Sequence, residues 1–305
     1  MEIRTVSIIG LGALGTMYAH HLNKKMQGLR VVADEERIAR YKRDGVTCNG
    51  ERCDFHFLAP GEGSPADLLI FAVKQGGLAG AIETARSQVG ENTIILSLLN
   101  GIISERMIGE AYGDGHVLLC VAQAMDAVMK DGHLTYHNMG QIVFGDREKG
   151  VVSGMTRDVD AFLTRMEVPH IADPDMPKRM WGKFMVNVGV NQVVAVYGEN
   201  YGDIQKPGFA RDEMIAAMRE VMVLSQKEGI FLDESDLEYW LGVLQGLSPM
   251  GKPSMRQDVE AQRLSEVELF SGTVLSLAEK YGIDTPVNRE LYRRVEEIEN
   301  GYAKG

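Results

Sequence analysis

The chain is poor in the residues that stabilise secreted and metal-binding proteins. It has only three cysteines, Cys48, Cys53 and Cys120. Three thiols do not make a disulfide framework, and Cys48 and Cys53 lack the second pair or the spaced histidines that a zinc site needs. The seven histidines form no metal-ligand spacing either. We therefore expect reduced thiols and no bound metal.

Long apolar runs and an excess of positive charge are also absent. No run of about eighteen apolar residues is present to span a bilayer, and the N-terminus lacks a basic-then-apolar leader. The formal net charge is −11, which disfavours nucleic acid or an anionic membrane as the main partner. We therefore expect a cytoplasmic protein that binds neither. An anionic ligand would have to be held by local positive charge.

What is present suits a two-domain globular protein. Hydrophobic residues make up 45% of the 305 residues and charged residues 25%. Strand and helix patterns alternate through the first half, which predicts a mostly parallel sheet with helices on both faces. The expected strands are 5–10, 29–33, 68–73, 93–98 and 116–122, and the expected helices are 14–26, 35–43, 77–87 and 103–112. Residues 132–145 predict one or two antiparallel edge strands, followed by a helix near 153–166 and a short strand near 168–172.

Strand signals end at the segment Asp173-Pro-Asp-Met-Pro177. Amphipathic patterns beyond it predict helices at 178–197, 208–228, 233–246, about 265–281 and 286–300. Ser265-Glu-Val-Glu268 has the form of a capping box, and Thr285-Pro286 that of an N-cap and first turn. We expect a Rossmann-type dinucleotide-binding domain (1–173) and then an all-helical domain (174–305). The seventeen methionines indicate helix packing, in a core or in a dimer interface.

The sequence Gly10-Leu11-Gly12-Ala13-Leu14-Gly15 follows a β-branched run and opens a helical pattern. Strand, G-x-G-x-x-G and helix in this order predict a dinucleotide site. The first glycine permits a tight turn, the second lets the backbone approach a pyrophosphate, and the third lets the helix pack on the strand. The helix N-terminus then offers N–H groups to the phosphates. A flexible turn before an ordinary helix is the plainer interpretation.

Asp34 stands at the expected end of the second strand, nineteen residues after Gly15. A carboxylate there accepts hydrogen bonds from the ribose hydroxyls of NAD and repels the additional phosphate of NADP. It also fits the N-cap of the following helix, and both roles are compatible.

Lys183, Asn187 and Asn191 are spaced four residues apart in the otherwise apolar stretch 180–197. On an α-helix this spacing gives one slowly drifting polar row. Burying these groups costs several kcal/mol unless each has a partner. The row is therefore either a satisfied structural network or the wall of a polar ligand site.

Five blocks together resemble the ketopantoate reductase (2-dehydropantoate 2-reductase) family over essentially the whole chain. The glycine loop is common to many dehydrogenases, whereas the helix and the serine–glutamate segment are far more specific. The blocks are the glycine loop, Val73-Lys74, Asn100-Gly101, Trp181-x-Lys183-x3-Asn187-x3-Asn191 and Ser254-Met-x-x-Asp258…Glu266. Individually, each block also has a structural explanation, such as a turn, a helix start or a surface charge.

The resemblance implies a role for each of these residues. Lys183 would be the general acid that protonates the reduced keto group, and Asn187 and Asn191 would hydrogen-bond the substrate. Glu266 would hold the substrate's hydroxyl end, and Ser254 would contact its carboxylate. Asn100 would position the nicotinamide and the carbonyl, and Lys74 would lie on the cofactor side. These roles suit the chemistry, because hydride delivery to a carbonyl builds negative charge on oxygen.

Two positions depart from the family pattern. Members commonly carry an arginine for the NADP phosphate where this chain has Asp34, so we expect a leaning toward NADH against the family's NADPH; Arg37 or Arg40 remains an alternative phosphate ligand. An asparagine often found three residues before the serine is Gly251 here, which removes one expected substrate contact.

Three functions follow from these observations. The leading hypothesis is NAD(P)H-dependent reduction of 2-ketopantoate, with a small 2-keto acid as the only partner besides a possible second copy of the chain. The alternatives are a reductase of another branched or hydroxylated 2-keto acid and a dinucleotide sensor without catalysis. Retention of both Lys183 and Glu266 argues against the sensor, which needs neither a proton donor nor an orienting acid.

Overall fold

The computed structural model describes residues 1–302 of the chain. It divides into two compact units, Met1–Pro177 and the part from Lys178 onward. The domain boundary predicted from the sequence, after residue 173, lies shortly before this division. No helix of residues 1–302 combines the length and the apolarity needed to cross a bilayer.

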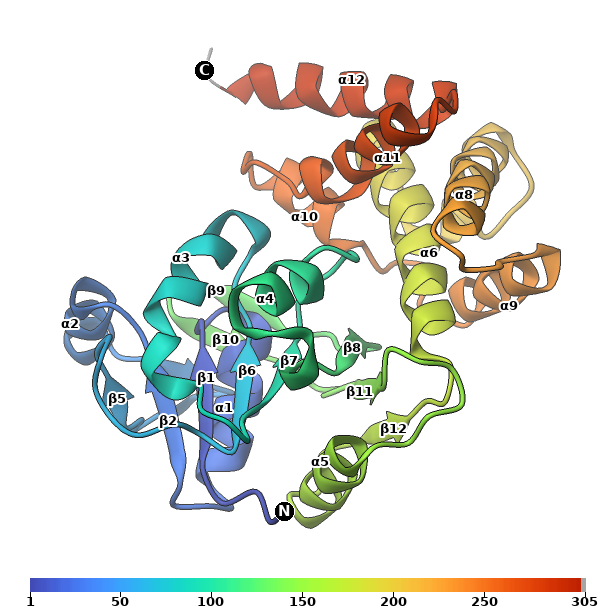
Figure 1. Ribbon diagram of the computed structural model, residues 1–305. Helices are drawn as coiled ribbons and strands as arrows, with labels where there is room; N and C mark the ends of the chain where they lie inside the picture. The colour runs from blue at the N-terminus through green and yellow to red at the C-terminus, as the bar shows by residue number, and fades with distance from the viewer. Residues whose placement is uncertain (303–305) are drawn as a thin grey trace. The chain divides into compact units, whose positions relative to one another are not determined.

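A five-stranded parallel sheet forms the centre of the first unit (Figure 1). Its order is β5-β2-β1-β6-β7, so the chain builds outward from β1 in one direction and then returns to the other side. Four of the predicted strands are confirmed, with ends trimmed by one or two residues. The bounds are β1 Val6–Ile9, β2 Leu29–Val32, β5 Phe57–Leu58, β6 Leu68–Phe71 and β7 Ile94–Ser97.

Helices cover both faces of this sheet, as the alternating pattern predicted. Side chains of alternate strand residues separate into two cores. Ile8 and Ile70 pack with α1 (Ala13–Asn23), whereas Ile9 and Leu69 pack with α3 (Leu78–Thr84) and α4 (Ser104–Tyr112). The other helices of this unit are α2 Glu35–Asp44, α3 Leu78–Thr84, α4 Ser104–Tyr112 and α5 Gly154–Arg165, with short 3-10 turns at Gln75–Gly77, Arg86–Gln88 and Asp114–His116.

The fifth predicted strand joins the parallel sheet through an isolated bridge, in which Val117 pairs parallel with Ile95 of β7, and its later residues belong elsewhere. The structure has β8 at Leu119–Gln123, which pairs antiparallel with β11 (Gln141–Gly145) in a separate sheet of order β12-β11-β8. The predicted strand near 168–172 is confirmed as β12, His170–Ala172, and it runs parallel to β11. Residues 132–145 therefore supply strands to two sheets rather than one edge.

The second small sheet has the order β4-β3-β10-β9, and sequence analysis missed most of it. Its strands are only two or three residues long, too short for a period-two pattern to register. They are β3 Thr47–Cys48, β4 Glu51–Arg52, β9 Val128–Lys130 and β10 His133–Thr135. The overlooked signal is the Asn49-Gly50 dipeptide, because both residues have the positive φ of a tight hairpin turn.

The second unit is all helical, as expected, and α6 (Met176–Tyr197) is its longest helix. Two glycines of α6 let neighbouring helices approach. A Cβ at Gly182 would stand 2.2 Å from Nε1 of Trp240, and one at Gly189 would stand 2.6 Å from Cγ of Met218. The other bounds are α7 Tyr201–Ile204, α8 Phe209–Lys227, α9 Glu234–Gln245, α10 Ser254–Glu260, a π-helical turn Glu268–Gly272, α11 Thr273–Tyr281 and α12 Pro286–Asn300.

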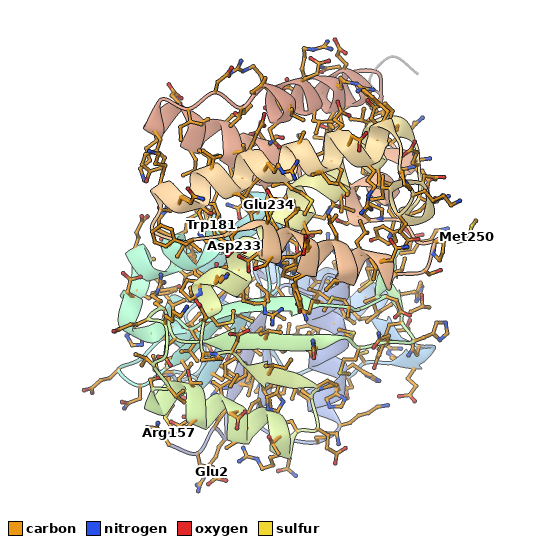
Figure 2. The ribbon with its side chains drawn as sticks, turned by 90° about the vertical axis from the view of Figure 1, so that its right-hand side faces the viewer. Glu2, Arg157, Trp181, Asp233, Glu234 and Met250 are labelled. Carbon is orange, nitrogen blue, oxygen red and sulfur yellow. The ribbon has the colours of Figure 1, made fainter. Side chains whose placement is uncertain are left out.

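Methionines fill the core of this unit, as their number suggested. Those buried here are Met180, Met185, Met214, Met218, Met222 and Met255. Met250, in the connection between α9 and α10, is the opposite case, since its side chain is 78% exposed and extends from the surface (Figure 2).

The predicted N-cap residue of the last helix stands at the N-cap position, but its side chain does not cap the helix. Thr285 precedes α12, but its hydroxyl is buried without a hydrogen-bond partner. The first N–H groups of α12 are capped from α8 instead. Both carboxylate oxygens of Glu220 accept hydrogen bonds, from the N–H groups of Val287 and Asn288, each at 2.9 Å. A tertiary carboxylate has replaced the local cap.

Candidate active site

The glycine loop connects β1 to α1 at the carboxyl end of the central strand. Gly10 has φ +99°, and a Cβ there would stand 2.7 Å from the carbonyl oxygen of Ala72. A Cβ on Gly15 would stand 1.9 Å from the carbonyl oxygen of Gly10. These two glycines are therefore required by the turn and by the packing of helix on strand, as predicted.

Gly12 is different, because the protein itself leaves room for a side chain there. The nearest heavy atom to an added Cβ is the carbonyl oxygen of Ala72, at 3.8 Å, an ordinary contact. Gly12 is also the N-cap residue of α1 and supplies no side-chain cap. The N–H groups of the first turn of α1 are therefore open to an anion, which fits a dinucleotide pyrophosphate.

The other predicted cofactor residues follow the carboxyl ends of neighbouring strands. Asp34 follows β2, the glycine loop follows β1, Lys74 follows β6 and Asn100 follows β7. The chain changes direction between β1 and β6, which is the topological switch point where open α/β sheets bind ligands. From β2 to β7 the sheet spans about 14 Å, at about 4.8 Å per strand. The predicted residues therefore lie along one edge of the sheet, in the order Asp34, glycine loop, Lys74 and Asn100.

Lys74 and Asn100 both lie beyond the ends of their strands. β6 ends at Phe71, and Lys74 is an exposed residue before the 3-10 turn Gln75–Gly77. Asn100 is half-buried in the loop between β7 and α4, and Gly101 beside it has φ +89°. The Asn-Gly pair therefore lies in a bend of the chain beyond the end of β7, at the edge of the sheet.

Asp34 is the N-cap of α2, which confirms one of its two predicted roles. Its Oδ1 accepts a hydrogen bond from the N–H of Arg37 at 2.7 Å, and its Oδ2 accepts one from the guanidinium of Arg37 at 2.6 Å. Both side chains are largely exposed, at 41% and 58%. The helix start and the pair with Arg37 thus engage both carboxylate oxygens.

In the second unit, the polar row lies on α6 as the spacing predicted. Lys183 and Asn187 are half-buried, and Asn191 is only 5% exposed. Successive members stand about 6 Å apart on one side of the helix. Trp240 packs over Gly182, directly before Lys183 in the chain, so α9 covers the helix beside the head of the row.

Asn191 reaches the second family-specific block. Its Oδ1 accepts hydrogen bonds from the hydroxyl of Ser254 at 3.1 Å and from the N–H of Met255 at 3.3 Å. Asn191 therefore anchors the beginning of α10, which agrees with the structural interpretation of the polar row. Ser254 and Glu266 do not share one helix, because α10 ends at Glu260 and an irregular segment follows.

The capping box at Ser265 and Glu268 is wrong. The N–H of Ser265 donates to Glu299 at 2.8 Å, the carboxylate of Glu268 accepts from the hydroxyl of Tyr292, and the Ser265 hydroxyl is buried without a partner. Hydrogen bonds to side chains of α12 therefore replace the two hydrogen bonds that a capping box would make. Glu266 therefore lies just before the helical turn, where its carbonyl oxygen accepts from the N–H of Leu269 at 3.0 Å.

Sequence analysis noted Gly251 but missed its neighbour Tyr201. A Cβ on Gly251 would stand 2.8 Å from Cδ2 of Tyr201 and 3.0 Å from the carbonyl oxygen of Ser248. Burial raises the pKa of Tyr201 to about 12. The tyrosine ring thus occupies the space that a longer side chain at 251 would need. Only the tertiary structure pairs these two residues.

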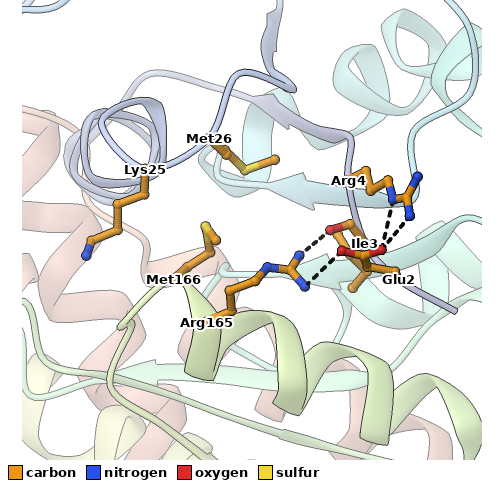
Figure 3. A pocket seen from close by; sticks show the side chains of 7 residues that line it. All are labelled: Glu2, Ile3, Arg4, Lys25, Met26, Arg165 and Met166. Atoms are coloured by element: carbon orange, nitrogen blue, oxygen red, sulfur yellow. Dashed lines mark hydrogen bonds and ion pairs between the residues drawn. The ribbon is translucent and has the colours of Figure 1, made fainter.

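A pocket of about 480 Å³ lies at the other end of β1 and α1, away from the glycine loop (Figure 3). Three cations line it, but each already has a carboxylate partner. Arg4 and Arg165 converge on Glu2, at 2.6 and 3.7 Å, and Lys25 pairs with Glu167 at 2.6 Å. Among residues 1–302, no three His, Cys, Asp or Glu side chains are grouped so as to hold a metal ion.

Comparisons with known proteins agree with this arrangement. Residues 6–149 match the family described as "Ketopantoate reductase PanE/ApbA", and residues 175–299 match "Ketopantoate reductase PanE/ApbA C terminal". The 2-dehydropantoate 2-reductase of Aquifex aeolicus is 25% identical over 94% of both chains. That of Archaeoglobus fulgidus is 25% identical over 99% of this chain and 100% of its own.

Solved structures share the whole fold at lower identity. A PanE/ApbA family ketopantoate reductase from Ralstonia eutropha has a TM-score of 0.82 at 21% identity, and a D-mandelate dehydrogenase with NADH and anilino(oxo)acetate has 0.84 at 19%. A dimeric ketopantoate reductase from Staphylococcus aureus has 0.77 at 21%. Each alignment covers 98% of this chain and 99% of the other. The chain belongs to the ketopantoate reductase family of NAD(P)-dependent oxidoreductases.

Proposed function

We propose that the protein reduces 2-dehydropantoate (ketopantoate) to pantoate with NAD(P)H, a step of pantothenate and coenzyme A biosynthesis. The observation that carries this proposal is the contact between Asn191 and Ser254, 3.1 Å apart and 63 residues apart in sequence. It joins the two blocks that most specifically resemble the family. Both blocks supply polar groups suited to an anionic, hydroxylated 2-keto acid.

The second unit supplies the proton and the substrate contacts. Lys183 donates a proton to the keto oxygen as negative charge develops there, and its ammonium stabilises that charge before transfer. Asn187 and Asn191 hydrogen-bond the substrate, Ser254 contacts its carboxylate and Glu266 accepts from its hydroxyl. Retention of a proton donor and an orienting acid supports catalysis over mere dinucleotide sensing.

The first unit supplies the cofactor residues. Gly10 to Gly15 and the N-terminus of α1 hold the pyrophosphate, Asp34 lies on the adenosine side, and Lys74 and Asn100 lie toward the nicotinamide side. A bound reduced nicotinamide supplies the hydride. The room left at Gly12, which no protein contact requires, supports this assignment.

A steady-state assay tests the proposal directly. Oxidation of NADH and NADPH is followed at 340 nm against ketopantoate, other branched 2-keto acids and aromatic 2-keto acids, with Lys183→Ala as the matched blank. We expect the highest kcat/KM with ketopantoate. Dinucleotide binding without turnover of any 2-keto acid would refute the reductase and favour a sensor.

A reductase of another 2-keto acid is the second candidate, and one observation favours it. Tyr201 packs at 2.8 Å from the Cβ position of Gly251, where the family often has asparagine. A ring then replaces one substrate hydrogen-bond donor, which suits a less hydroxylated side chain. In the same assay this candidate predicts a higher kcat/KM for an apolar branched or aromatic 2-keto acid.

For the cofactor, we propose that NADH serves at least as well as NADPH. Asp34 places a carboxylate beside the expected 2′ position, where the phosphate of NADPH carries about −1.5 to −2 charges. The pairing of Asp34 with Arg37 moderates this repulsion without removing it, because both groups are exposed to solvent screening.

We also propose a homodimer. Exposed apolar side chains of the second unit, among them Phe231 at 74% and Tyr239 at 52%, offer surface for a second copy. Light scattering across a concentration series tests this, and a monomer at every concentration would refute it. The expectation of a cytoplasmic location stays a prediction.

A further inference from the structure

A buried hydrogen bond closes the base of the loop that carries Asn100. β7 ends at Ser97 and α4 begins at Ser104, and both serines are completely buried. Their Oγ atoms stand 2.8 Å apart. This bond links the two ends of the six-residue loop 98–103, so the loop's conformation depends on it.

The donors and acceptors of this bond are fixed by its neighbours. The Ser104 hydroxyl donates to Oε2 of Glu105 at 2.8 Å, which uses its only proton. The Ser97 hydroxyl must therefore donate to Ser104, and its oxygen accepts from the N–H of Leu99 at 3.4 Å. A directed chain thus runs from the loop backbone through two hydroxyls to Glu105.

Glu105 is an unusual residue to find at the end of this chain. Its side chain is only 1% exposed, and Oε1 has no hydrogen-bond partner. Burial raises the pKa of this carboxyl group to about 7. Four weaker influences lower the pKa: the hydrogen bond from Ser104, the N–H of Glu105 itself, the charge of Arg147 and the N–H of Cys120. Arg147 contacts Glu105 only at the backbone oxygen and pairs with Asp114, each at 3.0 Å.

Packing alone does not account for this carboxyl group. An apolar side chain would fill the site without the cost of burying a polar atom that lacks a partner. The oxygen that faces Ser104 accepts equally well in the neutral acid, whose proton then sits on Oε1. The Glu105 side chain therefore accepts the hydrogen bond from Ser104 whether it is protonated or ionised.

We propose that Glu105 is a positioning residue, which accepts from Ser104 and thereby holds the loop that presents Asn100 to the nicotinamide and the reacting carbonyl. This inference rests on the proposed function for the role of Asn100. The hydrogen-bond chain itself does not depend on the proposed function, so the inference and the proposed function can fail separately.

The test compares Glu105→Leu, which removes the acceptor, with Glu105→Gln, which keeps one. Glu110→Leu is the control, because Glu110 lies on the same helix and is 70% exposed. Its ion pair with Arg106 is long, at 3.8 Å, and exposed to solvent. Ser104→Ala breaks the chain with a smaller change and decides the matter if Glu105→Leu does not fold. Amide hydrogen exchange of residues 98–103 and steady-state kinetics are measured for each.

We expect loop exchange to be about tenfold faster in Glu105→Leu and Ser104→Ala and unchanged in Glu105→Gln and Glu110→Leu. The kcat should fall about 10- to 100-fold in the first two, with KM for the 2-keto acid little changed, because misplacement by about 1 Å costs that much. Unchanged exchange in both chain-breaking variants overturns the inference. Faster exchange with an unchanged kcat overturns the inference too. An inactive unmodified protein refutes the proposed function, and the exchange result then decides whether the hydrogen-bond chain holds the loop.

Discussion

Oδ1 of Asn191 accepts the hydroxyl of Ser254 at 3.1 Å and the N–H of Met255 at 3.3 Å. One buried carboxamide of α6 thus fixes the start of α10. The same oxygen cannot be given wholly to a substrate, so the substrate contact proposed for Asn191 would have to use its amide nitrogen or a rearranged α10. This dual use gives the first prediction.

Asn191→Ala should destabilise the protein by about 1–3 kcal/mol, because the N–H of Met255 loses its acceptor inside the protein. It should also raise KM for the 2-keto acid. Ser254→Ala removes an exposed hydroxyl and should cost less than about 1 kcal/mol while still raising KM. Urea unfolding and substrate titrations measure both. Equal and negligible stability losses would show that Asn191 does not anchor α10.

Lys183→Ala should fold normally and lose about 10²–10⁴-fold in kcat, the usual contribution of a positioned general acid. Lys183→Arg keeps the charge but is a poor proton donor, so it should recover little of the loss. Lys178→Ala is the control on the same helix, since Lys178 pairs with Asp236 at 2.9 Å and no substrate contact is proposed for it. Turnover close to the unmodified level in Lys183→Ala would remove its catalytic role.

Glu266→Gln should weaken substrate binding more than dinucleotide binding, because a ligand hydroxyl loses a charged acceptor. Glu268→Gln is the control two residues later, where the carboxylate accepts from Tyr292 and has no expected substrate contact. Calorimetric titrations with each ligand separate the effects. A similar loss of both affinities in Glu266→Gln would indicate a structural role.

Asp34→Asn should shift the ratio of kcat/KM for NADPH over NADH upward by about tenfold. Asparagine still caps α2, but the negative charge is removed and Arg37 is released for a phosphate. Asp34→Arg should reverse the preference at a stability cost of about 1 kcal/mol for the lost cap. Asp44→Asn, at the far end of the same helix, is the control. If the unmodified enzyme prefers NADPH tenfold or more, the proposed preference is wrong, and Arg37 or Arg40 is the expected phosphate ligand.

Glu105 should make the fold less stable as pH rises. Burial raises its pKa to about 7 in the folded state, from an ordinary value of 4.5. Its contribution is therefore fully present below pH 4.5 and is lost as the pH passes through 7. At about 1.4 kcal/mol per pKa unit, the free energy of unfolding should fall by about 2–3 kcal/mol between pH 5 and pH 8. Glu105→Gln cannot titrate and should lack this decline.

Urea unfolding of both proteins across this pH range measures the difference. The neighbouring titratable groups are Arg147, which pairs with Asp114, and the buried thiol of Cys120, and both proteins share them, so the difference between the two curves isolates Glu105. Parallel curves for the two proteins would show that Glu105 is not titrating in this range.

Features carried by local chain geometry could be predicted from the sequence. The glycine loop, the four central strands and the polar row of α6 each depend on residue spacing within one or two elements. The same is true of the Asp34 cap, where the accepting N–H is three residues away. Backbone geometry and side-chain period fix such features before any distant contact forms.

Features decided by competition between distant groups could not be predicted. Ser265 and Glu268 do not form a capping box, because both of them hydrogen-bond to side chains of α12 instead. The start of α12 is capped by Glu220 of α8 and not by Thr285. The packing of Tyr201 on Gly251 and the burial of Glu105 depend on which helices meet. A local motif contributes about 1 kcal/mol, which a charged tertiary partner matches or exceeds. Spacing along the chain therefore determined where the candidate site residues stand, and tertiary packing decided which partners polar groups take inside the protein.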